Sequence, residues 1–249
     1  MISPGILLSL ALSILATSFL SGIFGMAGGL ILLGVFVALL DVAPALVLHG
    51  ITQLAANGWR AWLWREHIVW SIVWRYGVAT IATFAVLRSL AMIPDRAVIY
   101  LCLGLMPFAT ELLPKRWAAD MTRPGAPWVC GVLMAALQVL SGTAGNFVDV
   151  FFQNSPLDRK QIVASKSATQ TINHSMRVIY FGSFASAFSA GIPWWGYLGA
   201  IACAMAGTSL AGQALNRMSD AEFRQWSRWF INTIAVIFIA RGLWLLVVR

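Results

Sequence analysis

Charged residues are scarce in this chain, and acidic residues are the scarcest of them. Asp, Glu, Lys and Arg together make up 10% of its 249 residues, whereas an ordinary soluble domain carries about 25%. Hydrophobic residues make up 59%, and the mean hydropathy is +0.79. So little surface charge excludes a soluble globular domain, and the composition predicts an all-α bundle embedded in a membrane.

The chain also lacks the residue clusters that bind metals, form disulfides or carry covalent catalysis. Its three cysteines, Cys102, Cys130 and Cys203, stand alone in apolar segments, and we expect inert packing residues. No HExxH, GxSxG or paired-aspartate motif occurs, and the three histidines do not have a metal-ligand spacing. We therefore expect no cofactor, no metal and no enzymatic activity.

Basic residues outnumber acidic ones by 17 to 9, which gives a formal net charge of +8. They lie mostly in short loops between apolar runs, where orientation bias and lipid headgroups account for them. No basic patch accompanies a nucleic-acid-reading module, so we expect membrane lipid rather than nucleic acid as a partner. Self-association into a homo-oligomer stays open.

Long apolar runs predict about eight spans, because a membrane-crossing helix needs about 20 apolar residues. We place the spans at 5–39, 43–64, 68–90, 96–113, 127–152, 161–189, 194–215 and 226–248. The first is too long for one straight helix, and its glycines divide it into Ile6–Leu20 and Leu30–Leu40. This pattern predicts a broken or re-entrant segment. No Lys or Arg precedes the run, so we expect a membrane segment rather than a cleaved signal.

A glycine-broken stretch occurs twice, as SGIFGMAGG at 21–29 and in reduced form as SGTAGNFVD at 141–149. A shift of 120 residues superposes Leu20, Ser21, Gly22 and Gly25 on Leu140, Ser141, Gly142 and Gly145. A shift of 117 superposes Asp41, His49, Thr52, Gln53 and Arg60 on Asp158, Lys166, Thr169, Gln170 and Arg177. We predict two related membrane halves, 1–114 and 127–249, joined by a polar linker at 115–126. Parallel and inverted repeats both stay open.

A stripe of polar residues follows each glycine-broken stretch. At about 100° per residue, each stripe falls on one helical face. The first comprises His49, Thr52, Gln53, Asn57 and Arg60, and the second Lys166, Thr169, Gln170, Asn173, His174 and Arg177. Ionisable residues inside a membrane are costly and usually face a cavity or a partner. Arg60 and Lys166 also fit interfacial positions near span ends, whereas Arg177 lies well inside its span.

These donors suit a small oxyanion as cargo. Glycine lets backbone N–H groups approach a ligand, half-helix N-termini add positive partial charge, and Arg and Lys add full charge. The predicted binding site therefore joins both stripes to Gly25, Gly28, Gly29, Gly142 and Gly145. Asp149 and His174 are candidates for proton coupling. Asp149 fits equally well as a fixed counter-charge to Arg177.

The chain resembles the sulfite exporter TauE/SafE family of membrane permeases. The resemblance rests on GIFGMAGGLILLGVFVALL, PALVLHGITQLAANGWRAWLWREHIVW and VASKSATQTINHSMRVIYF, and it covers most of the chain. It implies a bacterial inner-membrane permease of about eight spans in two related halves. By position, it implies site roles for Gly25, Gly28, Gly29, Lys166, Thr169, Asn173 and Arg177. The second glycine cluster departs from the family pattern, because it has fewer glycines and no proline.

Stripes, glycine breaks and resemblance together predict a polytopic membrane transporter. We expect it to export sulfite, a sulfonate or a related organic anion by alternating access, with ion or proton coupling left open. A non-catalytic membrane assembly factor or scaffold is the alternative. An intramembrane enzyme is a further alternative, for which the chain has no catalytic motif.

Overall fold

The described part of the protein is entirely helical. The computed structural model describes the backbone of residues 2–248 apart from 25–26, 113–119, 143–144, 153–154 and 216–219. Side chains are described for the same residues except 22–24, 27, 110–111, 141, 145–146, 159, 185, 212–215 and 220–231. The α-helices are α1 (Pro4–Phe24), α2 (Ala27–Leu39), α3 (Val42–Leu63), α4 (Trp70–Leu87), α5 (Arg96–Leu112), α6 (Ala126–Ser141), α7 (Gly145–Phe152), α8 (Arg159–Gly182), α9 (Trp194–Leu215) and α10 (Asp220–Val247).

The two glycine-broken stretches interrupt helices as predicted. α1 ends at Phe24 and α2 begins at Ala27, while α6 ends at Ser141 and α7 begins at Gly145. Gly142 closes α6 with a φ of 71°, a left-handed conformation that glycine adopts without a Cβ penalty. Its N–H donates to the Gln138 carbonyl at 3.0 Å. Gly25 lies outside the described residues, as do residues 115–119 of the predicted linker.

An aspartate precedes each of the two polar helices. Asp41 is the N-cap of α3, and Asp158 is the N-cap of α8. The Asp158 carboxylate accepts from the Gln161 N–H at 2.9 Å, and the Gln161 side chain accepts from the Asp158 N–H, which forms a capping box. Both helices therefore begin at the positions that the 117-residue shift superposes. His49 and Lys166 consequently lie at the same distance from the starts of their helices.

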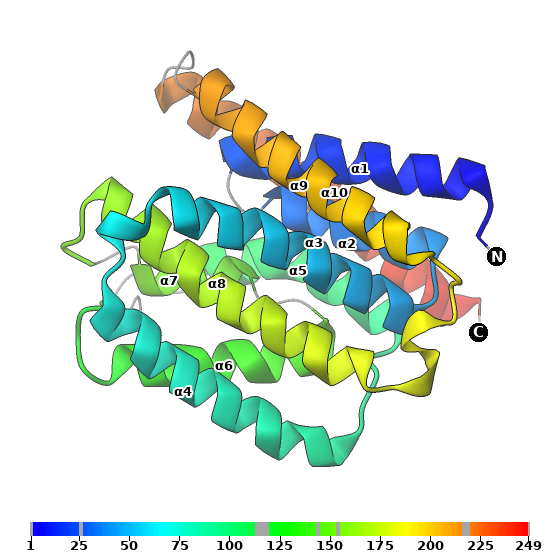
Figure 1. Ribbon diagram of the computed structural model, residues 1–249, viewed down its shortest axis with the longest axis horizontal. Helices are drawn as coiled ribbons and strands as arrows, with labels where there is room; N and C mark the ends of the chain where they lie inside the picture. Colours follow the sequence, from blue (N-terminus) through cyan, green and yellow to red (C-terminus); the bar gives the residue numbers. More distant parts are fainter. Residues whose placement is uncertain are drawn as a thin grey trace.

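Four pairings of helices organise the bundle: α1 with α9, α4 with α6, α3 with α8, and α5 with α10. Figure 1 shows α1 and α9 along one side, α4 and α6 along the opposite side, and α3 and α8 between them. α3 and α8 are antiparallel, because Gly50 lies against Val178 whereas Gly58 lies against Thr171. This central pair brings His49 of the first stripe into contact with Arg177 and His174 of the second.

The bundle exposes many apolar side chains and buries several polar ones within a largely apolar core. Large hydrophobic residues such as Leu8, Val86 and Leu243 are exposed on its outer surface, while the polar residues of α3 and α8 are mostly buried. Such a distribution suits contact with lipid rather than water. Two described segments, Pro4–Ser21 and Trp70–Leu90, are long and apolar enough to cross a membrane, and four shorter apolar helices accompany them.

Candidate functional site

Arg177 is the largest fully buried side chain in the described protein, with 1% of its surface exposed. It projects from α8, and its guanidinium donates to His49 Nδ1 of α3 and to the Gly142 carbonyl that ends α6. The carboxyl end of a helix carries negative partial charge, which favours a cation there. Arg177 therefore ties three helices together through two acceptors, neither of which is a carboxylate.

The contacts of His49 fix its tautomer. A guanidinium only donates hydrogen bonds, so His49 Nδ1 must accept from Arg177. The other ring nitrogen, Nε2, lies 2.9 Å from the Gly29 carbonyl, which only accepts. His49 is consequently the neutral Nε2–H tautomer. A chain of hydrogen bonds thus runs from Gly142, beside the second helix break, through Arg177 and His49 to Gly29, beside the first.

A row of unpartnered polar atoms extends from Arg177 along α8. Among the described residues, eight buried side-chain atoms lack a hydrogen-bond partner, and five belong to this row: both amide atoms of Gln170, Asn173 Oδ1, His174 Nδ1 and Arg177 Nε. Their spacing places them on one helical face. A buried polar group without a partner costs about 1–3 kcal/mol. The row therefore indicates a position where water or a polar ligand completes the bonding.

Gln138 of α6 joins the site, and sequence reasoning missed it. Its Nε2 donates to the Asn173 carbonyl at 3.5 Å, and Asn173 Nδ2 donates to Gln138 Oε1 at 3.4 Å. Both residues are buried. The available signal was a lone amide in the apolar segment GVLMAALQVL, four residues before the Gly142 break.

Several predicted site residues use their polar groups within their own helix. The Thr52 hydroxyl donates to the His49 carbonyl at 3.0 Å, and the Thr169 hydroxyl donates to the Lys166 carbonyl at 2.8 Å. Asn57 Nδ2 donates to the Gln53 carbonyl at 2.9 Å. These bonds pair the hydroxyl protons and one amide proton internally, which leaves the hydroxyl oxygens as acceptors.

The predicted glycines take different places in the structure. A Cβ at Gly28 would lie 2.6 Å from the Ser21 nitrogen of α1, so Gly28 permits close packing of α2 on α1. Gly29 lies beside the Gln53 amide, which a Cβ would contact at 3.4 Å. Gly145 begins α7, and its surroundings lie outside the described side chains.

Lys166 and Asp149 form a separate polar group nearer the start of α8. The Lys166 ammonium pairs with Asp149 Oδ1, and their side chains are 21% and 40% exposed. Eleven residues separate Lys166 from Arg177, which is about 16 Å along a helix. Asp149 therefore pairs with Lys166 rather than Arg177. The structure divides the predicted site into a buried group around Arg177 and a partly exposed group around Lys166.

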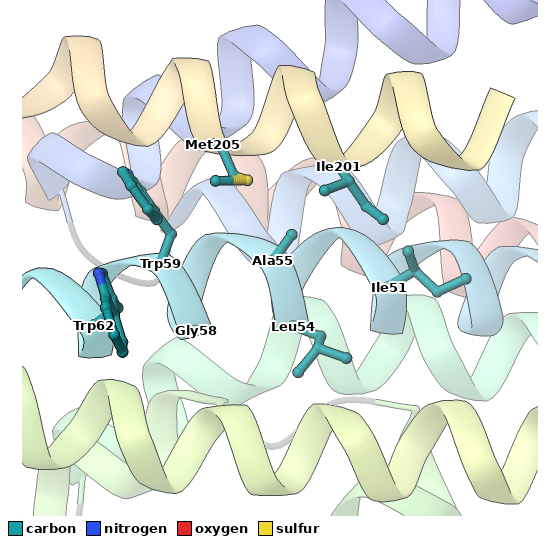
Figure 2. Close-up of a pocket in the computed structure, with 8 residues that line it drawn as sticks. All are labelled: Ile51, Leu54, Ala55, Gly58, Trp59, Trp62, Ile201 and Met205. Carbon is teal, nitrogen blue, oxygen red and sulfur yellow. The ribbon is translucent and has the colours of Figure 1, made fainter. Parts of the chain in front are cut away.

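The opposite face of α3 is apolar. A groove of about 530 Å³ between α3 and α9 is lined by Ile51, Leu54, Ala55, Gly58, Trp59, Trp62, Ile201 and Met205 (Figure 2). Trp59 Nε1 donates to the Ser209 hydroxyl at 3.1 Å, so its one polar atom is already bonded. None of these eight described lining residues is charged.

The family model of the sulfite exporter TauE/SafE matches residues 10–239. The chain belongs to this family. Comparison with curated proteins and comparison with solved structures each gave no match. TauE/SafE proteins are multi-pass membrane transporters of sulfite-type anions rather than enzymes, and this chain is accordingly a membrane transporter.

Gly142→Ala tests the break that presents a carbonyl to Arg177 in this TauE/SafE protein. Alanine at a φ of 71° costs about 1–2 kcal/mol, and its Cβ would lie 3.0 Å from Leu46 Cδ2. We expect a lower thermal unfolding midpoint in detergent. Gly125→Ala is the matched control, because φ there is −84° and nothing lies within 4 Å. Equal midpoints for the two variants would contradict the role of Gly142.

Proposed function

We propose that this protein exports a small oxyanion by alternating access and binds it at the group formed by Arg177, His49, Gln170, Asn173 and His174. Sulfite, a sulfonate or a related organic anion is the cargo. The resemblance to bacterial permeases supports a bacterial inner membrane as its location. The observation that carries the proposal is the charge of Arg177, which is buried among neutral acceptors.

An anion supplies the counter-charge that Arg177 lacks. Within the described residues, the ion pairs join Arg96 to Asp41 and Lys166 to Asp149. A buried cation without a carboxylate is costly in a low-dielectric interior, and an oxyanion cargo offsets that cost. The planar guanidinium matches two oxygens of an oxyanion at once, and the Gln170 amide and Arg177 Nε are unpartnered donors in the same row.

Anion binding in this scheme releases a link between helices. Arg177 Nη atoms bond to His49 and Gly142 in the described state. An oxyanion that binds Arg177 Nε and the Gln170 amide draws the guanidinium toward itself and thereby competes with His49 and Gly142 for the Nη donors. Once Arg177 turns to the anion, α3, α6 and α8 lose their shared connection. Cargo binding thereby favours a rearranged bundle, which is what alternating access requires.

Inverted repeats are the architecture proposed for that rearrangement. In this arrangement α1 is equivalent to α6, α2 to α7, and so on to α5 and α10. The α1–α9 pairing is then equivalent to the α4–α6 pairing, while the α3–α8 and α5–α10 pairings are each equivalent to themselves. In Figure 1, α3 and α8 run in opposite directions. Because the equivalent helices α3 and α8 are antiparallel, the two-fold axis that relates the halves lies in the membrane plane in this proposal. Residues 1–114 and 127–249 then form the two halves.

Proton coupling stays a prediction for two residues. The His174 ring centre lies 5.8 Å from that of His49, so His174 is close enough to respond to changes at Arg177. Asp149 is bonded to Lys166 and partly exposed. A proton on either group changes the charge beside the proposed anion path.

Cysteine labelling tests the inverted arrangement. The α3–α4 connection and the α8–α9 connection are equivalent, and Figure 1 has them at opposite ends of the bundle. We expect Glu66→Cys and Ser186→Cys, each in a background without Cys102, Cys130 and Cys203, to react with an impermeant maleimide from opposite sides of the membrane. Both sites are exposed. Reaction of both cysteines from the same side would support parallel repeats instead.

Replacement of Arg177 tests the anion site. We expect Arg177→Gln to abolish sulfite transport in proteoliposomes, and Arg177→Lys to reduce it strongly because lysine cannot bind two oxygens in a fork. Arg65→Gln is the control for loss of one positive charge, because Arg65 is exposed and stacks on Trp62. The thermal midpoint of each variant verifies folding. Wild-type rates in folded Arg177→Gln would rule out the assigned role.

A further inference from the structure

The two halves make the same connection with different chemistry. The 120-residue shift superposes Gly29 on Asp149, and the 117-residue shift superposes His49 on Lys166. In the first half, His49 Nε2–H donates to the Gly29 carbonyl at 2.9 Å. In the second half, the Lys166 ammonium pairs with the Asp149 carboxylate. Each contact joins the short helix after a break to the polar helix that follows it.

The antiparallel α3–α8 pair extends this equivalence to Arg60. Lys166 is the equivalent of His49, and Arg60 is the equivalent of Arg177. If the halves are exchanged, the contact between His49 and Arg177 corresponds to a contact between Lys166 and Arg60. The observed contacts between Gly50 and Val178, and between Gly58 and Thr171, follow the same antiparallel register. The exchange and this register together predict that Arg60 lies, relative to Lys166, as Arg177 lies relative to His49. Neither ion pair within the described residues involves Arg60.

Charge and accessibility distinguish this second position from the buried site. Lys166 and Arg60 bring two cations, against the single carboxylate of Asp149. The Lys166 and Asp149 side chains are 21% and 40% exposed, whereas Arg177 is 1% exposed. A partly exposed ion pair adds little to stability, and the first half makes the equivalent connection without an acid.

We propose that Lys166 and Arg60 form a second oxyanion site, and that Asp149 is a tethered competitor which occupies it while cargo is absent. A carboxylate presents two oxygens to a cation in the same way as a sulfite or sulfonate group. An arriving oxyanion displaces Asp149 and then lies about 16 Å along α8 from Arg177. The inference rests on the proposed function only for the class of ligand.

The proposal is tested by removing the Asp149 carboxylate from a protein that already lacks the Arg177 guanidinium. Binding of sulfite and of methanesulfonate is measured by calorimetry on purified Arg177→Gln protein, with and without Asp149→Asn. A tethered group acts at an effective concentration of millimolar or more, so we expect Asp149→Asn to raise affinity by about tenfold or more. Adding Lys166→Gln or Arg60→Gln should remove the gain. Asp149→Gly, which restores the residue of the first half, should act like Asp149→Asn.

Controls separate a local site from a general change of charge. Asp41→Asn removes the acid of the other ion pair, with Arg96, and should leave anion affinity unchanged. Equal affinity with and without Asp149→Asn, or a gain that survives Lys166→Gln, would overturn the second site. If wild-type protein binds no anion but Asp149→Asn does, the second site stands while the Arg177 site fails. Binding by wild type with no effect of Asp149 contradicts this inference alone.

Discussion

The contact of Arg177 with His49 and Gly142 is the interaction on which the rest of the structure depends. A guanidinium in the middle of an apolar bundle requires acceptors, and regular helices offer none because their carbonyls are already bonded. The break at Gly142 supplies a free carbonyl at the end of α6, and neutral His49 supplies a ring nitrogen. Helix break, histidine tautomer and buried charge therefore depend on one another. All three lie where the start of α3 meets the last turns of α8 and the end of α6.

α3 separates two environments. Its polar face meets α8 and α2, while its other face borders the apolar groove with α9 (Figure 2). Along α8, the polar row also divides, since Arg177 is buried near one end and Lys166 is partly exposed near the other. In the proposed function, cations at two depths and the neutral amides between them form a stepwise path for an anion. The proposed exchange between inverted halves acts across this same pair of helices.

The sequence predicted the features that depend on local chain properties. Hydropathy located the helical segments, and glycines located both breaks. The 117-residue shift matched Asp41 with Asp158, which the structure shows to be the N-caps of α3 and α8. Contacts between elements that lie far apart in the sequence were harder to predict from it. Gln138 lies on a helix outside both stripes, so only the packing of α6 on α8 reveals its bond with Asn173. For the same reason, the sequence offered Arg177 as the counter-charge of Asp149, whereas the packing of α7 against α8 pairs Asp149 with Lys166. Repeat direction depends on whether the short helices α2 and α7 count as passes, and hydropathy does not decide that.

Crystallography with selenite, a sulfite analogue whose selenium scatters anomalously, tests the central claim most directly. We predict an anomalous peak within hydrogen-bond reach of Arg177 and the Gln170 amide, with the guanidinium turned away from the Gly142 carbonyl. An unchanged guanidinium on His49 and Gly142 at saturating selenite, with selenium elsewhere in the molecule, would contradict it.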